Sequence, residues 1–543
     1  MVFEKIVGRL QHSNSSNTKN FDALDGFRGL AILLVVLGHY WTIANGSATD
    51  RKPFMLWDLD VTNVFMLAGH GVQMFFVMSA FLLYLPFARE PLVENRAARI
   101  KKFYWRRFLR IYPAFLVYTI VGVLIFRFFS ANGSTTSILN LLSNLTFLQP
   151  LMVFLGDGSV TQDVLPGTWS LVLEVYFYVL LPIVALLTKR TLTFVVLSVT
   201  MLSVSIAYRM NVYPLLNDLQ LSPPQKGIAL LNFIPFLDAF ALGIVSARVY
   251  AFLERLKKPA PRIVYGLMVY LPLIGLGYLL SDPLSPAVLG NVLPAFLTDP
   301  RLLFNLCMVT LVPGMLIYNS YVSRLLSLPI LRFAGIVSYS VFLMHLSFAQ
   351  VAIDPVLEFL RIYRYEDKLV IHLFLTMPLA IAFGTLLYLF IERPFLISGP
   401  FTQRFSSCVT LFRSCWPELS LRKASVFLLC WYAIGSLTLQ AATNRDQKVS
   451  MFRAADFTDE NWKLGVAKDG QKLLLRYDRD LLQSLKRARA IILKDGQSVE
   501  VSGVVDTGGP WIHLYLKNLN PDETEYPNRL LIEPIPAAAV GQS

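Results

Sequence analysis

The chain of 543 residues is 55% hydrophobic and 13% aromatic, and only 16% of its residues are charged, against about a quarter in a typical soluble protein. Apolar runs long enough to cross a bilayer, about 20 residues each, recur up to roughly residue 441. This composition excludes a soluble globular protein and predicts a polytopic membrane protein. We expect no signal peptide, because the polar segment before Leu24 lacks a short apolar core followed by small residues.

The expected fold is an all-α polytopic membrane bundle of about 10–11 transmembrane helices, with a small, mostly β C-terminal domain outside the membrane. The spans are expected near 24–43, 66–87, 109–129, 168–187, 191–207, 227–250, 264–280, 301–320, 330–351, 369–391 and 424–441. Segment 136–155 is ambiguous, and the fifth and last spans are short, so the count holds to within one.

The net charge of +13 does not predict nucleic-acid binding, because acidic and basic residues balance after Thr443. The basic excess lies in the membrane part, in loops near 89–107, 189–190, 255–262 and 404–423, whereas the intervening loops 130–165 and 281–300 carry almost none. The positive-inside rule places the basic loops in the cytoplasm. Eleven spans then put the N-terminus inside and the C-terminal domain outside.

The chain divides into four expected parts. Residues 1–23 form a cytoplasmic N-terminal segment, 24–397 the main membrane domain, 398–443 a cytoplasmic linker with the last transmembrane helix, and 444–543 the small soluble domain. In that last part, turn signals at 494–496 and 507–509 flank the alternating "SVEVSGVV", and "WIHLYL" follows, which predicts antiparallel strands. We interpret this domain as a structural or glycan-contacting module.

Two ionisable residues stand in the first span, "LDGFRGLAILLVVLGHY". Arg28 and His39 are eleven positions apart, so they share one helical face at a separation of roughly 16 Å along the axis. Such groups normally face a protein interior or a water-filled cavity. Arg28 could also snorkel to the interface and His39 could be a hydrogen-bonded core residue. A neutral histidine is, however, the usual general base near neutral pH.

A second polar group lies in "GTWSLVLEVYFYVLLPI", where Thr168 is expected to cap the helix and Ser170 and Glu174 share a face. A carboxylate inside a membrane helix needs a partner, and an intramembrane His or Arg is the obvious one. Structural pairing and catalysis both remain open for Glu174.

The third group is the basic stretch "RIKKFYWRRFLRIYP", in which Arg106, Arg107 and Arg110 recur at helical spacing. These arginines are either ordinary topology determinants that also contact anionic lipid, or an anion site, since guanidinium forks bind phosphate bidentately. The four cysteines (Cys307, Cys408, Cys415 and Cys430) have no metal-ligand spacing, and no metal is expected.

Six stretches together resemble, in order, the motifs of the bacterial membrane acyltransferase family 3: "LDGFRGLAILLVVLGHY", "GVQMFFVMSAFLLY", "RRFLRIYP", "GTWSLVLEVYFYVLLPI", "SYSVFLMHLSF" and "IERPF". The resemblance covers about residues 20–397. The chain departs from the family pattern at Gln73, where an acidic residue is usual, and at Ala80. The tail also lacks the Gly-Asp-Ser and Asp-x-x-His signatures of the esterase-like domain that many members carry.

The resemblance implies an integral-membrane O-acyltransferase that moves an acyl group, usually acetyl from acetyl-CoA, to a hydroxyl. It maps the Arg–His pair of the family's first span onto Arg28 and His39, the acidic residue of its "TWSL…E" motif onto Glu174, and its basic-loop arginines onto Arg106, Arg107 and Arg110. Our leading hypothesis makes His39, Glu174 and Arg28 catalytic, with His39 as the base and Glu174 orienting or charging its imidazole. It places the phosphates of acyl-CoA on Arg106, Arg107 and Arg110. Trp169 and Ser170 of the same motif as Glu174 are expected to contact substrate.

We expect the bacterial cytoplasmic (inner) membrane as the location, membrane lipid and a sugar or polysaccharide acceptor as partners, and no nucleic acid; a homo-oligomer is compatible with the sequence. The favoured acceptor is a cell-surface glycan such as lipopolysaccharide or exopolysaccharide.

Two alternative functions remain. A transporter or flippase of a lipid-linked glycan would also have many spans with buried charges, and an acyl-CoA transfer assay separates it from the enzyme. A non-catalytic scaffold for polysaccharide assembly fits three buried polar groups less well.

Overall fold

The computed structural model describes most of the chain up to residue 415 and six strands beyond it. The described ranges are 7, 22–45, 55–56, 59–60, 65, 68–90, 96–129, 138–154, 167–218, 223–256, 260–280, 299–360, 365–397, 401–415, 462–467, 470–476, 490–493, 498–506, 511–516 and 530–532. The chain separates into two compact units, Met1–Ala433 and Ile434–Ser543.

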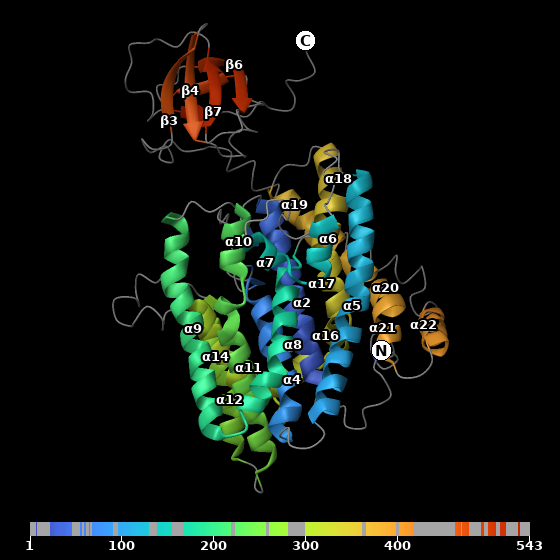
Figure 1. The fold of residues 1–543 in the computed structure, drawn as a ribbon. Coiled ribbons are helices and arrows are strands. Elements are labelled where there is room, and N and C mark those ends of the chain that lie inside the picture. The colour runs from blue at the N-terminus through green and yellow to red at the C-terminus, as the bar shows by residue number, and fades with distance from the viewer. Residues whose placement is uncertain are drawn as a thin grey trace. The chain divides into compact units, whose positions relative to one another are not determined.

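The first unit is a bundle of long helices (Figure 1). These are α2 (Asp22–Asn45), α4 (Gly71–Arg89), α5 (Arg96–Phe129), α8 (Trp169–Leu187), α9 (Thr191–Asp218), α11 (Leu237–Glu254), α12 (Arg262–Leu280), α14 (Pro300–Ile317), α17 (Ser338–Ser347) and α20 (Met377–Leu387). Eight helical segments among the described residues are long and apolar enough to cross a membrane. The chain is therefore a multi-pass membrane protein. The spans expected at 109–129 and 264–280 fall within α5 and α12, and 424–441 lies outside the described residues.

Shorter elements connect the long helices. They are α6 (Ile138–Leu145), α7 (Gln149–Phe154), α10 (Pro223–Leu231), α15 (Tyr321–Leu326), α16 (Pro329–Ile336), α18 (Asp354–Phe359), α19 (Tyr365–Ile371), α21 (Arg393–Leu396) and α22 (Phe401–Cys415), with the 3₁₀ turn η1 (Ile234–Phe236), the π-helical segments η3 (Phe348–Ile353), η4 (His372–Thr376) and η5 (Tyr388–Glu392), and the two-residue strands β1 (Met55–Leu56) and β2 (Leu59–Asp60). The ambiguous segment 136–155 forms α6 and α7, each too short to cross a bilayer.

Two local predictions need correction. Thr168 precedes α8 as expected, but its side chain makes no capping hydrogen bond, because its backbone is already helical (φ −75°, ψ −11°). The span expected at 330–351 begins instead at Ser338. Pro329 starts the separate helix α16, which ends at Ile336, and Val337 leaves the helical conformation before α17 begins.

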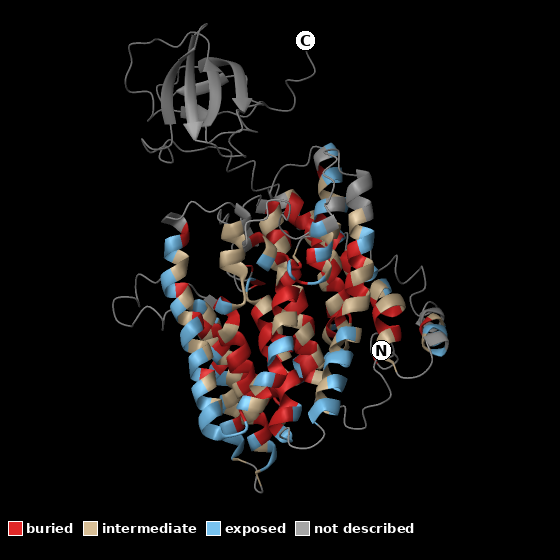
Figure 2. Ribbon diagram, viewed as in Figure 1, coloured by how far each residue is buried: buried red, intermediate tan, exposed pale blue. Residues whose placement is uncertain are grey.

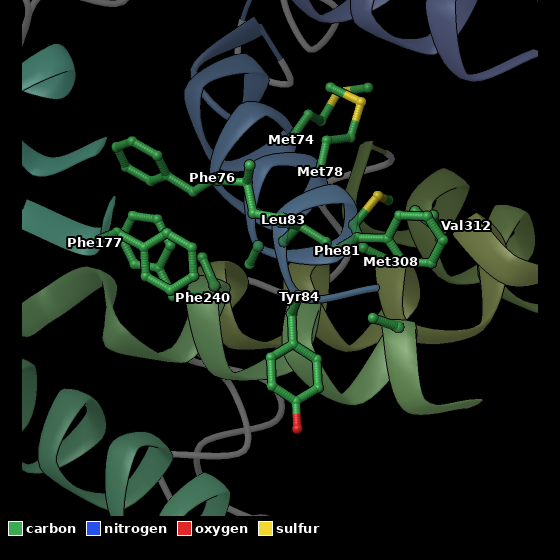
Figure 3. Close-up of a cluster of buried hydrophobic side chains, with 14 of the residues drawn as sticks. Met74, Phe76, Met78, Phe81, Leu83, Tyr84, Phe177, Phe240, Met308 and Val312 are labelled. Atoms are coloured by element: carbon green, nitrogen blue, oxygen red, sulfur yellow. The ribbon is translucent and has the colours of Figure 1, made fainter. Parts of the chain in front are cut away.

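Helix α4 lies at the centre of the bundle and is apolar on all sides, as its position requires. Phe76 of α4 packs on Phe240 of α11 with ring centroids 4.9 Å apart, and Phe240 stacks on Phe177 of α8 at 4.3 Å. Figure 3 shows this aromatic group on one side of α4, and Met308 and Val312 of α14 next to Phe81 on the other side. The core therefore joins α4, α8, α11 and α14 and supports one wall of the site described below.

The outer helices show the opposite pattern. Along α9, apolar side chains such as Leu192, Val196 and Val199 are exposed, and Figure 2 shows most of this helix in the exposed and intermediate colours. Exposed apolar side chains over a whole helix are unfavourable in water and are favourable against lipid tails. This face of the bundle therefore contacts the bilayer.

Close helix contact and an internal ion-pair network hold the bundle together. A Cβ atom on Gly29 of α2 would lie 1.9 Å from the Leu331 carbonyl oxygen of α16, so only glycine permits this approach. Arg209 of α9 pairs with Asp238 at 3.0 Å and with Asp299 at 2.7 Å. These contacts tie α9 to α11 and to the start of α14 inside the bundle.

The second unit contains β3 (Trp462–Ala467), β4 (Gly470–Arg476), β5 (Ala490–Leu493), β6 (Ser498–Asp506), β7 (Trp511–Leu516) and β8 (Leu530–Ile532). Its strand order is β3-β4-β7-β6-β5-β8, and every pairing is antiparallel. The register between β6 and β7 shifts between Val501 and Gly503, which marks a β-bulge. The location of this unit outside the membrane, and the four domain boundaries, stay predictions.

Candidate functional site

Five helices of the bundle enclose a cavity of about 130 Å³. Arg28 of α2, Ser79 of α4, Arg107 of α5, Glu174 of α8 and Tyr339 of α17 all belong to its wall. These residues come from distant parts of the sequence, and their helices pack against one another in the bundle, with α5 on its outer side (Figure 1). The cavity therefore brings polar and charged side chains of five helices together inside an otherwise apolar bundle.

The wall of the cavity carries an excess of positive charge. Among the described residues that line it are Arg28, Arg107 and Arg110 but only one carboxylate, that of Glu174. Arg28 Nη2 lies 3.4 Å from the hydroxyl of Ser338, and no carboxylate among the described residues forms an ion pair with Arg28 or Arg107. The Nε atom of Arg107 is buried and has no hydrogen-bond partner in the described part of the chain. A buried donor without a partner is costly, so this wall suits an anionic ligand.

Arg110 is held by a buried acid. Its Nη1 atom lies 2.5 Å from Glu392 Oε1, and the hydroxyl of Ser340 donates to Glu392 Oε2 at 2.7 Å. Glu392 ends the π-helical segment η5, and its side chain is fully buried. Short π-helical stretches inside α-helices are frequent at functional sites. The pairing leaves Arg28 and Arg107 as the cavity arginines with no carboxylate in ion-pair contact among the described residues.

The structure does not bring Glu174 to the imidazole that the sequence suggested. Glu174 Oε1 accepts hydrogen bonds from Ser79 at 2.6 Å and from Tyr178 at 2.5 Å. Tyr178 follows Glu174 by one turn of α8, and Ser79 faces it from α4. The side chain therefore points across the α4–α8 interface into the cavity, within electrostatic range of Arg28. Pairing with His39 is replaced by these two hydroxyl donors.

His39 lies outside the cavity wall, about three turns of α2 beyond Arg28. The helix is continuous from Asp22 to Asn45, so the separation of roughly 16 Å along the axis between Arg28 and His39 stands. His39 Nδ1 lies 3.1 Å from Nε2 of His345 on α17. Phe342, one turn before His345, lines the cavity, and its ring centroid is 5.6 Å from that of His345. The histidine pair thus lies next to one end of the cavity.

The remaining predicted site residues divide between cavity and surroundings. Ser170 lines the cavity together with Glu174. Trp169 is half-buried and lies 5.6 Å from the ring of Phe236, away from the cavity wall. Arg106 is exposed on the face of α5 that turns away from the cavity, unlike Arg107 and Arg110. Within the described residues, no group of three or more His, Cys, Asp or Glu side chains could hold a metal ion.

Sequence reasoning did not single out His345, Glu392, Tyr178 or Ser79. His345 and Glu392 stand in the quoted stretches "SYSVFLMHLSF" and "IERPF", and each is an ionisable residue within an apolar run. That signal is the same one that identified Arg28 and Glu174. Tyr178 and Ser79 carry no such signal, because their importance comes only from facing Glu174.

The motif order agrees with a comparison of the sequence against known families. The pattern of a family described as an acyltransferase domain matches residues 21–393. The chain belongs to the acyltransferase-3 family. The match covers α2 through the start of α21 and includes every cavity residue named above. The family resemblance expected from the six motifs is therefore confirmed.

Curated relatives of this chain are named for O-acetyl transfer. Proteins of Staphylococcus aureus strains COL, MSSA476 and N315, each named "Putative O-acetyltransferase", are 22% identical to this chain over 395 residues. The alignment covers 69% of this chain and 57% of each relative, so the chain matches little more than half the length of those proteins. No solved structure matches the chain.

Proposed function

We propose that this acyltransferase-3 protein is an O-acyltransferase that moves an acyl group, acetyl being favoured, from acyl-CoA to a hydroxyl of a cell-surface glycan such as lipopolysaccharide or exopolysaccharide. The observation that carries the proposal is the cationic cavity, in which the buried Nε of Arg107 has no partner among the described residues. A phosphate-bearing donor supplies the acceptor oxygens that this wall needs. The histidine near the end of the cavity supplies the base.

The donor side of the site consists of Arg107, Arg110 and Arg28. The guanidinium of Arg107 presents a planar fork that matches phosphate oxygens, and Arg28 adds charge from α2. Glu392 holds Arg110 in place and neutralises part of its charge. Coenzyme A carries its thioester at the end of a long flexible arm. Phosphates bound among the arginines therefore let the thioester extend along α2 towards His39.

The acceptor side consists of His39. In the transfer step, His39 Nε2 removes the proton from the acceptor hydroxyl while the hydroxyl oxygen forms a bond to the acyl carbon. The carbon–sulfur bond of the thioester breaks, and the coenzyme A thiolate leaves and takes up the proton that the imidazole then releases. Glu174 balances the charge of the arginines in the cavity. Ser170 lines the cavity from α8, and its neighbour Trp169 lies outside the cavity wall. Both residues are the proposed substrate contacts.

The proposal also places the protein. Its location is the bacterial inner membrane, with the N-terminus and the basic loops in the cytoplasm and the C-terminal unit outside. Arg255 of the α11 end donates to backbone carbonyls at the end of α4, so these two basic helix ends meet at one end of the bundle. Cytoplasmic acyl-CoA would enter from that end, and the glycan acceptor would approach His39 from the other.

The test is an acyl-transfer assay on the purified full-length protein in proteoliposomes, with radiolabelled acetyl-CoA as donor and surface glycan from a deletion strain as acceptor. His39→Ala should lower transfer by about 10²–10⁴-fold, while the protein still inserts and binds acetyl-CoA. Thr42→Ala is the matched control, because Thr42 lies one turn from His39 on α2 and its hydroxyl, as far as the structure describes the chain, donates only to the Gly38 carbonyl.

Transfer at the wild-type rate by a well-folded His39→Ala protein would disprove His39 as the base. The wild-type protein could instead show neither transfer nor donor hydrolysis and move glycan across the vesicle membrane. This result would favour a transporter. Mass spectrometry of surface glycans from the deletion strain gives an independent measurement, since the proposal requires the loss of an acyl group.

A further inference from the structure

His345 occupies a position that its burial alone does not explain. It is fully buried on α17, and its two ring nitrogens contact two different groups. Nδ1 lies 2.7 Å from the carbonyl oxygen of Phe342, one turn earlier on the same helix. Nε2 lies 3.1 Å from Nδ1 of His39 on α2, although the two histidines are 306 positions apart in the chain.

These contacts determine where the protons lie. A carbonyl oxygen only accepts hydrogen bonds, so Nδ1 of His345 carries a proton and donates it to Phe342. A neutral imidazole has one N–H, which leaves Nε2 of His345 as an acceptor. The proton between the two rings therefore belongs to His39 Nδ1. His39 Nε2 is then the unprotonated nitrogen, which is the atom that a general base must present.

A charged His345 would give the opposite assignment, but the surroundings oppose it. Its ring contacts are aromatic or backbone groups, and none of the described carboxylates forms an ion pair with it. Burying an imidazolium without a carboxylate partner is costly. The neutral form with Nδ1–H is therefore the resting state.

We propose that His345 is the positioning residue for His39. It selects the Nδ1–H tautomer of His39 and holds the ring so that Nε2 faces the reacting hydroxyl. After His39 has taken the acceptor's proton, its Nδ1–H still donates to the same neutral nitrogen of His345, so the charged ring keeps a hydrogen-bond partner. This role rests on the proposed function of His39 as the base.

Two substitutions of His345 test the hydrogen bonds of its two ring nitrogens separately. In His345→Gln, the side-chain amide reaches the place of Nε2 and can turn its oxygen towards the N–H of His39. In His345→Asn, the amide reaches only the place of Nδ1, so the bond to Phe342 is retained and the acceptor for His39 is lost. Tyr40→Phe is the control for packing, because the one hydrogen bond of the Tyr40 hydroxyl within the described residues is the one that it donates to the backbone oxygen of His345.

The experiment measures acetyl transfer by full-length protein in proteoliposomes, at saturating and at low acetyl-CoA, and counts folded molecules by acetyl-CoA binding. We expect His345→Asn to lower kcat by about 10²-fold or more with an unchanged KM for acetyl-CoA, His345→Gln to retain most of the turnover, and Tyr40→Phe to behave as wild type.

Equal turnover in the Asn and Gln variants would overturn the positioning role, whether both are active or both inactive. Loss of acetyl-CoA binding in His345→Asn would also overturn it, because the residue would then be a structural element of the bundle. Failure of the proposed function gives a different result, since His39→Ala would then retain transfer whatever the His345 variants do.

Discussion

Glu392 Oε1 lies 2.5 Å from Arg110 Nη1, and the two residues are 282 positions apart in the chain. The contact joins the end of η5 to the middle of α5, and the hydroxyl of Ser340 from α17 completes the coordination of the carboxylate. One buried carboxylate therefore connects three helices around the cavity. Because Arg110 also belongs to the cavity wall, the stability of the bundle and the charge of the site are coupled at this pair.

Removing the acid of this pair should destabilise the protein. Glu392→Gln leaves the guanidinium of Arg110 without its carboxylate, and breaking a buried pair on one side costs about 3–5 kcal/mol. The control is Glu254→Gln, which breaks the exposed pair with Arg89 (side chains 42% and 33% exposed) and should cost less than about 1 kcal/mol. Thermal unfolding of both variants in the same detergent gives the comparison, and an equal shift of the two melting temperatures would contradict the prediction.

The basic segment offers a test of the donor site within two adjacent residues. Arg107→Lys keeps the charge but loses the planar fork, and we expect the Kd for acetyl-CoA to rise about tenfold, which corresponds to about 1.4 kcal/mol. Arg106→Lys, on the exposed face of α5, should leave the Kd unchanged. Isothermal titration of acetyl-CoA into each purified protein measures the difference. Equal weakening in both variants would mean that the segment acts through its overall charge.

Much of this site was predictable because ionisable residues are rare in membrane helices. Arg28 and Glu174 stood out as charges within apolar runs, and Arg107 and Arg110 stood out by their spacing. The structure places all four on one cavity. Most of the long helices were predictable from the length of the apolar runs, whereas the start of the span at Ser338 and the two short helices in 136–155 needed the structure. The span expected at 424–441 lies outside the described residues and stays a prediction.

The pairing of these side chains was not predictable. Local patterns show which face of a helix is polar, but the partner depends on how helices distant in sequence pack. Glu174 was expected to meet an imidazole, and it meets the hydroxyls of Ser79 and Tyr178. His39 was expected to meet a carboxylate, and it meets His345. Both corrections come from the order of the helices around the cavity.

Glu174 should affect turnover more than donor affinity. Glu174→Gln removes the one carboxylate of the cavity wall, so the repulsion between this wall and the phosphates of acetyl-CoA falls. We therefore expect an unchanged or lower Kd for acetyl-CoA and a lower kcat, because the arginines lose the charge that balances them. Tyr178→Phe removes a hydrogen bond to Glu174 but keeps its charge, and should leave the Kd unchanged. Weaker binding of acetyl-CoA by Glu174→Gln would contradict this prediction.

Helix packing around α2 should be sensitive to a single methyl group. An alanine Cβ at position 29 would lie 1.9 Å from the Leu331 carbonyl oxygen, and one at position 335 would lie 1.8 Å from the Asp25 carbonyl oxygen. Gly29→Ala must therefore separate α2 from α16, and overpacking of this kind typically costs about 1–3 kcal/mol or more. Gly266→Ala is the control, because nothing lies within 4 Å of its Cβ position. It should be neutral or stabilise α12 by up to about 1 kcal/mol. Thermal unfolding of the two variants measures the contrast, and similar melting temperatures would disprove the tight contact.

The orientation of the bundle follows from the charge of its loops and can be tested by labelling single cysteines. On a background without the four native cysteines, a cysteine at Lys102, which is exposed near the start of α5, should be protected from an impermeant thiol reagent in intact cells and labelled after lysis. The physical reason is that the basic segment 89–107 stays on the cytoplasmic side during insertion. A cysteine at Asn461 should show the opposite behaviour, because eleven spans place residues 444–543 outside. Protection at both positions would mean that one span fewer or one span more separates them than the eleven-span topology requires. Labelling of Lys102→Cys in intact cells would mean that the bundle has the opposite orientation in the membrane. Cytoplasmic acyl-CoA could then not enter from the end where the basic loops lie.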